Sequence, residues 1–193
     1  MTDLPARLLA ALSPGYSPGR FLGRVMLFSL AVLLPVLALY VALIPGFAGH
    51  LWQGGPAAGR FLRQVLTNGL VTVSLMNVSG LLLMHHARHH PPMRRIAADI
   101  LLRLALFIGL HGVVFWGSAL LFGAFGGDPV QALRVVGPTL AQAGAFANLS
   151  GVYLYAGLVS ALLWQAAVLG KARALALLAG QIIALATLTR LLS

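Results

Sequence analysis

Residues 25–47 read VMLFSLAVLLPVLALYVALIPGF and contain no charged side chain. A helix needs about 20 apolar residues to cross a hydrocarbon core of roughly 30 Å, and this run is longer. It is also too long for the apolar part of a signal peptide, which has roughly 7–15 residues, so we expect a retained transmembrane helix. Apolar runs of this kind therefore decide the fold.

Four further apolar runs follow, at residues 65–84, 100–125, 147–169 and 172–192. Between the third and fourth, we expect residues 129–145 to form a short interfacial or partly inserted helix that breaks near Gly137-Pro138. The alternative is six spans with a tight hairpin near Gly144. The sequence thus predicts an all-α, polytopic transmembrane helical bundle of about five spans plus a short interfacial helix, in one domain covering residues 1–193.

The composition excludes a soluble globular protein. Of 193 residues, 60% are hydrophobic and 8% are charged, with a mean hydropathy of +0.93, whereas soluble domains carry about 25% charged residues. The absence of cysteine excludes disulfides, thiolate metal sites and a cysteine nucleophile. The cations are scattered without a basic stripe or stacking aromatics, which argues against a nucleic-acid partner and favours contact with the lipid bilayer.

The distribution of Lys and Arg predicts the orientation. One side of a five-span bundle carries Arg7, Arg20, Arg24, Arg88, Arg94, Arg95, Lys171 and Arg173. The other carries Arg60, Arg63, Arg134 and Arg190. The positive-inside rule then places the N-terminus in the cytoplasm, with residues 4–14 as a short helix on that leaflet, and the C-terminus in the periplasm. Residue usage rich in Ala, Leu, Gly and Arg is typical of a GC-rich bacterium, so we expect the inner membrane.

A histidine cluster follows the second span, at His85, His86, His89 and His90. On a continuing helix these residues form two i, i+4 pairs, a spacing that can bring two imidazoles onto one metal ion. However, Arg88 lies among them and no carboxylate or thiol is close in sequence. The alternative is a solvated or headgroup-facing loop that gains positive charge as the pH falls.

Polar residues inside the spans are candidate functional residues because they are costly in a membrane. They are Asn77, Asp99, Arg103, His111 and Asn148. Asp99 and Arg103 are one helical turn apart, so we expect an ion pair near the cytoplasmic end of the third span. His111 lies near mid-membrane, and we expect it to bond Asn77, Ser79, Asn148 or Tyr153, or else to relay protons or ions.

The last span has small residues at strict four-residue spacing, namely Ala172, Ala176, Gly180 and Ala184. Such stripes let membrane helices approach closely. We expect this stripe to pack inside the bundle, with self-association as the alternative. No catalytic site is predicted, because general acid–base chemistry by paired carboxylates needs two of them close together. The plausible ones, Asp99 and Asp128, lie at opposite ends of the third span.

The C-terminal half resembles bacterial members of the Yip1 family. The resemblance rests on Gly126-Gly127-Asp128, the stretch QALRVV at 131–136, a span with Asn148 near its start, and Lys171-Ala172-Arg173-Ala174-Leu175. Ser17-Pro18-Gly19-Arg20-Phe21 fits the usual beginning of that family. The resemblance covers about half of the chain and implies a five-span bundle with a cytoplasmic N-terminus. It implies no catalytic residues.

These observations favour a non-catalytic membrane protein, without cofactor, that scaffolds or associates with other membrane proteins or with itself. The first alternative is a small transporter or metal-handling protein that uses the histidine cluster and the intramembrane polar residues. The second is an accessory subunit of a respiratory or photosynthetic complex, which would suit the polar second span.

Overall fold

The computed structural model describes residues 4–15, 17–43, 54–128 and 149–192. Within these ranges the chain is helical and contains no strand, which confirms the all-α prediction. Four helices are long and apolar enough to cross a membrane, at Pro18–Leu43, Phe61–His89, Pro92–Val113 and Gly151–Leu169. The predicted interfacial helix at 129–145 and the possible hairpin at Gly144 lie outside the described residues.

The helices α1 (Leu4–Ala11) and α2 (Pro18–Leu43) form the N-terminal part. The first matches the short helix expected at residues 4–14. The second begins at Pro18, ahead of the apolar run at 25, because Arg20 and Arg24 are good helix formers that extend the helix toward water. The helix α1 packs on α9.

The second span consists of three consecutive helical segments: α4 (Gly55–Gln64), a π-helical turn (Val65–Gly69) and α5 (Leu70–His86). At the π-turn, the ring of Tyr153 lies against the backbone of Gly69, and its hydroxyl donates a hydrogen bond to the Gln64 carbonyl over 3.1 Å. Such one-turn π-bulges distort the regular ladder locally. The tyrosine therefore fastens α9 to the second span at this turn.

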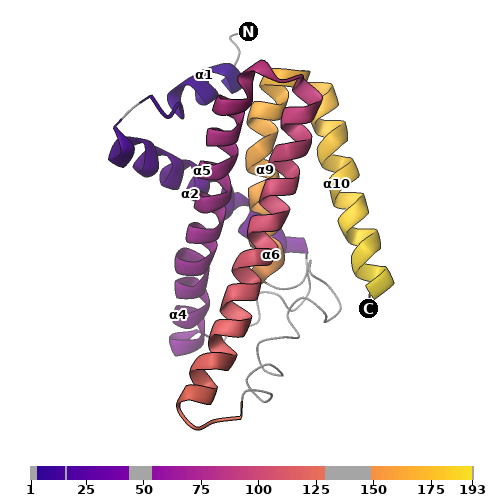
Figure 1. Cartoon of the computed structure of the whole chain (residues 1–193). Helices are drawn as coiled ribbons and strands as arrows, with labels where there is room; N and C mark the ends of the chain where they lie inside the picture. The colour runs from indigo at the N-terminus through magenta and orange to yellow at the C-terminus, as the bar shows by residue number, and fades with distance from the viewer. Residues whose placement is uncertain (1–3, 16, 44–53, 129–148, 193) are drawn as a thin grey trace.

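The remaining helices are α6 (Pro92–Ala124), α9 (Leu149–Leu169) and α10 (Lys171–Leu192). The helix α6 starts with a proline at its first turn, where the missing N–H costs no intrahelical hydrogen bond. The helix α10 covers the range predicted for the fifth span and packs along α9, but it is not one of the four helices that are long and apolar enough to cross a membrane, so the fifth span stays a prediction. In Figure 1, α1, the α5–α6 connection and the α9–α10 connection gather at one end of the bundle, and α4 lies at the other.

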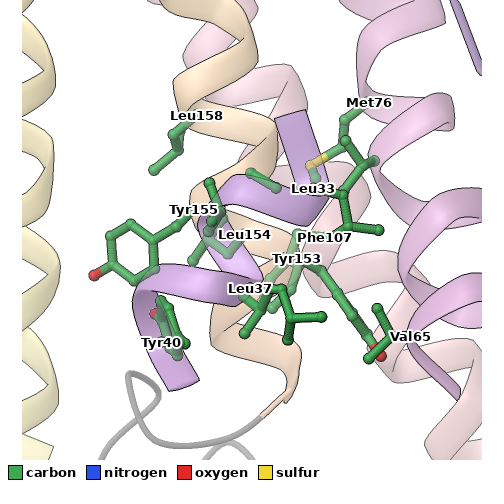
Figure 2. Packing of buried hydrophobic residues seen from close by; sticks show 14 of the residues in the cluster. Leu33, Leu37, Tyr40, Val65, Met76, Phe107, Tyr153, Leu154, Tyr155 and Leu158 are labelled. Atoms are coloured by element: carbon green, nitrogen blue, oxygen red, sulfur yellow. The ribbon is translucent and has the colours of Figure 1, made fainter. Parts of the chain in front are cut away.

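The helix α9 forms the centre, in contact with α1, α2, α5, α6 and α10. Of its membrane-spanning part 61% is buried, compared with 22% for α6. In one half of the bundle, tyrosines and aliphatic side chains of α2, α5 and α9 form a cluster; the rings of Tyr40 and Tyr155 lie 6.0 Å apart, and Tyr153 extends toward Val65 (Figure 2). The other half holds the polar residues described next.

Candidate functional site

An ion pair is enclosed at the centre of the bundle. The helix α6 places Asp99 and Arg103 one turn apart, and Arg103 Nε donates to Asp99 Oδ1 over 3.0 Å. Both side chains are 0% exposed. The expected pair is therefore present, but it is surrounded by protein and does not lie at an open helix end.

The second oxygen of Asp99 is held by α9. Trp164 Nε1 donates to Asp99 Oδ2 over 2.8 Å, and the Arg103 guanidinium carbon lies 4.7 Å from the centre of the Trp164 ring. The indole thus makes a charge-assisted hydrogen bond with the carboxylate and a cation–π contact with the guanidinium. One side chain of α9 thereby recognises both charges of α6.

Arg103 also joins α5 to α9. Its Nη1 atom donates to Asn77 Oδ1 over 3.0 Å and to the carbonyl of Gly157 over 2.7 Å. Its Nη2 atom is buried and has no hydrogen-bond partner among the described residues. A charged group in an apolar interior is costly unless it is paired and hydrogen-bonded, so these bonds offset most of that cost.

Asn77 extends the network to a fourth helix. Its Nδ2 atom donates to Ser29 Oγ of α2 over 2.9 Å and to Ser160 Oγ of α9 over 3.2 Å. Ser160 in turn donates to the Ala156 carbonyl over 2.6 Å. We call the set Ser29, Asn77, Asp99, Arg103, Ser160 and Trp164 the central network. It links α2, α5, α6 and α9 through side chains that are all buried.

Two glycines make this close packing possible. A Cβ atom on Gly80 of α5 would clash with Asp99 Oδ1 and Arg103 Nη2, and one on Gly157 of α9 would clash with the Met76 side chain. The absence of a side chain at these positions lets the charged pair lie directly on the α5 backbone. Small residues serve the same purpose at other membrane-helix contacts.

His111 lies outside the central network. It is half-buried on α6, its Nδ1 atom is 2.8 Å from the Phe107 carbonyl, and its ring is 4.1 Å from that of Phe107. Asn77 donates to Ser29 and Ser160, and Tyr153 donates to the Gln64 carbonyl, so the pairing of His111 with one of its expected partners stays a prediction. The histidine satisfies a ring nitrogen within its own helix. Asn148 lies outside the described residues.

The histidine cluster lies on the surface. The helix α5 ends at His86, a 3-10 turn covers Ala87–His89, and His90 is extended. All four imidazoles are exposed, and among the described residues no three His, Cys, Asp or Glu side chains converge to hold a metal ion. His86 Nδ1 lies 2.9 Å from the Leu82 carbonyl, and Arg88 Nε donates to His89 Nε2 over 3.2 Å. Metal binding by His85, His86, His89 and His90 thus stays a prediction without a preformed site.

The small-residue stripe of α10 faces outward. Ala172, Ala176, Gly180 and Ala184 are all exposed, whereas Ala174 is 0% exposed. Leu178 and Ile182 pack against the core cluster. The expectation that the stripe packs inside the bundle is therefore wrong, because the larger side chains on the other face of α10 make the contact with α9.

Three residues of the central network were not predicted, namely Ser29, Ser160 and Trp164, and Gly80, against which the ion pair packs, was not predicted either. Ser29 and Ser160 are isolated hydroxyls within apolar runs, which is the signal available in the sequence. The pairing of helices decides which of these residues meet. Comparison of the chain with protein families, with curated proteins and with solved structures gives no match.

Proposed function

We propose that the chain is a non-catalytic multi-pass membrane protein that associates with other membrane proteins, or with itself, through the outward face of α10. The observation that carries this proposal is the exposure of all four small residues at Ala172, Ala176, Gly180 and Ala184. In a membrane, helices gain little from hydrophobic burial against one another. Close backbone approach along such a stripe is one of the main sources of their affinity.

The contacts of α10 within the chain support this role. The buried face, with Ala174, Leu178 and Ile182, is used against α9. A Cβ on Gly180 would meet no atom within 4 Å, so the outward face is open at its centre. A partner helix can therefore approach α10 without displacing any part of the bundle.

The central network supports a structural role over a catalytic one. Both oxygens of Asp99 accept hydrogen bonds, from Arg103 and from Trp164, and the amide of Asn77 bonds three side chains. A general acid or base needs an accessible atom for proton transfer to substrate. We infer that the network fixes the relative position of four helices and so gives the association face a rigid support.

The test is isolation in mild detergent at native expression, followed by measurement of the mass and composition of the complex. We expect stoichiometric membrane partners or a homo-oligomer. Replacing Gly180→Leu should remove them because the new side chain fills the contact face. Gly109→Leu on α6 is the matched control, since a Cβ there also meets no atom within 4 Å. A lone chain in the parent protein, or equal loss with both variants, would contradict the proposal.

We further propose the inner membrane, with a cytoplasmic N-terminus and a periplasmic C-terminus. Support comes from the excess of Lys and Arg at the end that holds α1 and the two helix connections (Figure 1). The absence of cysteine makes the test direct, because single substitutions such as His90→Cys and Phe125→Cys each introduce one thiol. A membrane-impermeant reagent should label only Phe125→Cys from outside spheroplasts. The reverse pattern would contradict this orientation.

A five-span Yip1-like protein remains compatible with this proposal. The second candidate function is a small transporter, and the buried charges of Asp99 and Arg103 favour it because intramembrane ionisable residues often mark ion pathways. Flux measured in proteoliposomes separates the two. A transporter shows flux in the unaltered protein, whereas a protein that only associates with other membrane proteins shows none. An accessory-subunit role would be recognised by the composition of the isolated complex.

A further inference from the structure

The second span carries polar side chains on an exposed surface. Gln64 ends α4, Thr67 and Asn68 lie in the π-helical turn, and all three are exposed. The Thr67 hydroxyl donates to the Arg63 carbonyl over 2.8 Å and lies 3.3 Å from Asn68 Oδ1. A hydroxyl has one hydrogen to donate, so the Asn68 amide keeps most of its hydrogen-bonding capacity. We call Gln64, Thr67 and Asn68 the polar face.

The hydrogen bond between α5 and α6 gives the depth of the polar face. These helices run in opposite directions, and Asn77 is level with Arg103, which donates to it. An equal number of residues along each helix from that bond brings Asn68 to about the level of Val113. Val113 is 71% exposed, and α6 continues past this level to Leu121, which is 63% exposed. In Figure 1, α6 correspondingly extends beyond α4 at this end.

The second span itself has exposed leucines on the far side of Asn68. Leu62 is 46% exposed and Leu66 is 47% exposed, and both precede Asn68 in the chain, toward the outer end of α4. Exposed aliphatic side chains on a membrane-spanning helix face the hydrocarbon core. This core therefore extends past Thr67 and Asn68 along both helices, and the two polar side chains lie within it.

A polar group that faces lipid at this depth is costly. Asn, Gln and Thr side chains of membrane helices offset this cost by hydrogen bonds to a neighbouring helix. The other side of the π-turn is already occupied, because the ring of Tyr153 lies against Gly69 and its hydroxyl bonds the Gln64 carbonyl. The polar face thus lies on the outside of the bundle, on a turn that α9 holds in place. Turns of this type are frequent at functional sites.

We propose that the polar face is the contact between two copies of this chain, with the Asn68 amide of one copy bonded to that of the other. Copies share one orientation in the membrane, so a two-fold axis along the membrane normal brings the same residue of each to the same depth. A side-chain amide carries both donors and an acceptor, so two Asn68 side chains can bond reciprocally. This contact is separate from the outward face of α10 and does not rest on it.

The test measures dimerisation of the full chain in liposomes by energy transfer between two C-terminally labelled populations, over a range of protein-to-lipid ratios. An interhelical hydrogen bond of this kind is worth roughly a threefold to thirtyfold factor in affinity, so Asn68→Leu should weaken the dimer about tenfold. Asn68→Gln keeps the amide and should retain the dimer. Gly180→Leu changes the outward face of α10 and should also retain it. A monomeric parent protein, or loss of the dimer in Gly180→Leu but not in Asn68→Leu, would overturn the proposal.

A second measurement uses oxidative cross-linking in native membranes, which is direct because the chain has no cysteine. Gln64→Cys lies one helical turn from Asn68 and should give a covalent dimer of the chain. Val113→Cys is the matched control, because it is exposed on α6 at about the same depth, and it should stay monomeric. Equal cross-linking of the two variants would indicate random collision and overturn the proposal. Cross-linking of Gln64→Cys to a different protein would overturn it as well, since the partner would then not be a second copy.

Discussion

Two groups of ionisable side chains lie close together in the sequence and differ completely in their surroundings. The histidines at 85–90 are exposed at the end of α5 and in the turn that follows, and three of them contact a backbone carbonyl, an arginine or another ring that is nearby in sequence. Asp99 and Arg103, a short way along the chain, are fully buried and bonded by α5 and α9. The difference shows that a dense local pattern of polar residues does not by itself create a site. Contacts between distant helices create it.

The largest expected effect comes from removing one member of the buried pair. Asp99→Asn leaves the Arg103 charge uncompensated in an apolar interior, which costs about 3–5 kcal/mol. We expect a large fall in folded yield and in the unfolding midpoint, measured in detergent by circular dichroism. The double variant Asp99→Leu/Arg103→Met removes both charges and should cost less than Asp99→Asn alone. If Asp99→Asn is as stable as the parent, the pair does not hold the bundle together.

A substitution at Gly80 of α5 tests the close packing of this helix against Asp99 and Arg103. Adding a Cβ by Gly80→Ala places it against Asp99 Oδ1 and Arg103 Nη2, and overpacking of this kind typically costs about 1–3 kcal/mol. Gly23→Ala on α2 is the control, because a Cβ there meets no atom within 4 Å. The unfolding midpoint should fall for Gly80→Ala and hold or rise for Gly23→Ala. Equal behaviour of the two variants would count against the close approach of α5 to the pair.

The sequence predicted the helical class and the pairing of Asp99 with Arg103, because both depend on local periodicity. It did not predict Trp164 as a partner of Asp99, since these residues are 65 positions apart and are joined only by the packing of α9 on α6. Asn77 was identified as a polar residue in a span, yet its bonds to Ser29 and Ser160 depend on which helices are neighbours. Sequence spacing does not contain this information.

The outward face of α10 is a second case in which sequence spacing does not identify the contact partner. The four-residue spacing from Ala172 to Ala184 predicts close helix packing, but spacing does not say whether the partner helix belongs to the same chain. In this bundle the buried residue Ala174 shows that the opposite face of α10 makes the contact within the chain, which leaves the small residues exposed. The same limit applies to the histidine cluster, whose i, i+4 spacing becomes a metal site only if the backbone continues as a helix.

A smaller effect is expected from Trp164→Phe. The phenyl ring keeps an aromatic face for Arg103 but has no N–H for Asp99 Oδ2, so one charge-assisted hydrogen bond is lost. Such bonds are worth about 1.5–3 kcal/mol, and the loss should be at the lower end because the Arg103 bond to Asp99 remains. An unchanged midpoint in Trp164→Phe would show that the indole N–H does not stabilise Asp99.

The smallest effect on stability is expected from the histidine cluster. This test bears most directly on the contrast between the exposed histidines and the buried pair of Asp99 and Arg103. Replacing His85, His86, His89 and His90 together by Asn should leave the unfolding midpoint unchanged, because exposed side chains without convergent partners contribute little to stability. The same measurement with added Zn²⁺ adds a second readout. A ligand that binds only the folded state raises its stability by mass action, so a preformed zinc site would raise the midpoint of the parent protein and not that of the variant. We expect no such difference. If one is observed, the exposed turn assembles around the metal, and the rule that distant contacts create the site would fail here.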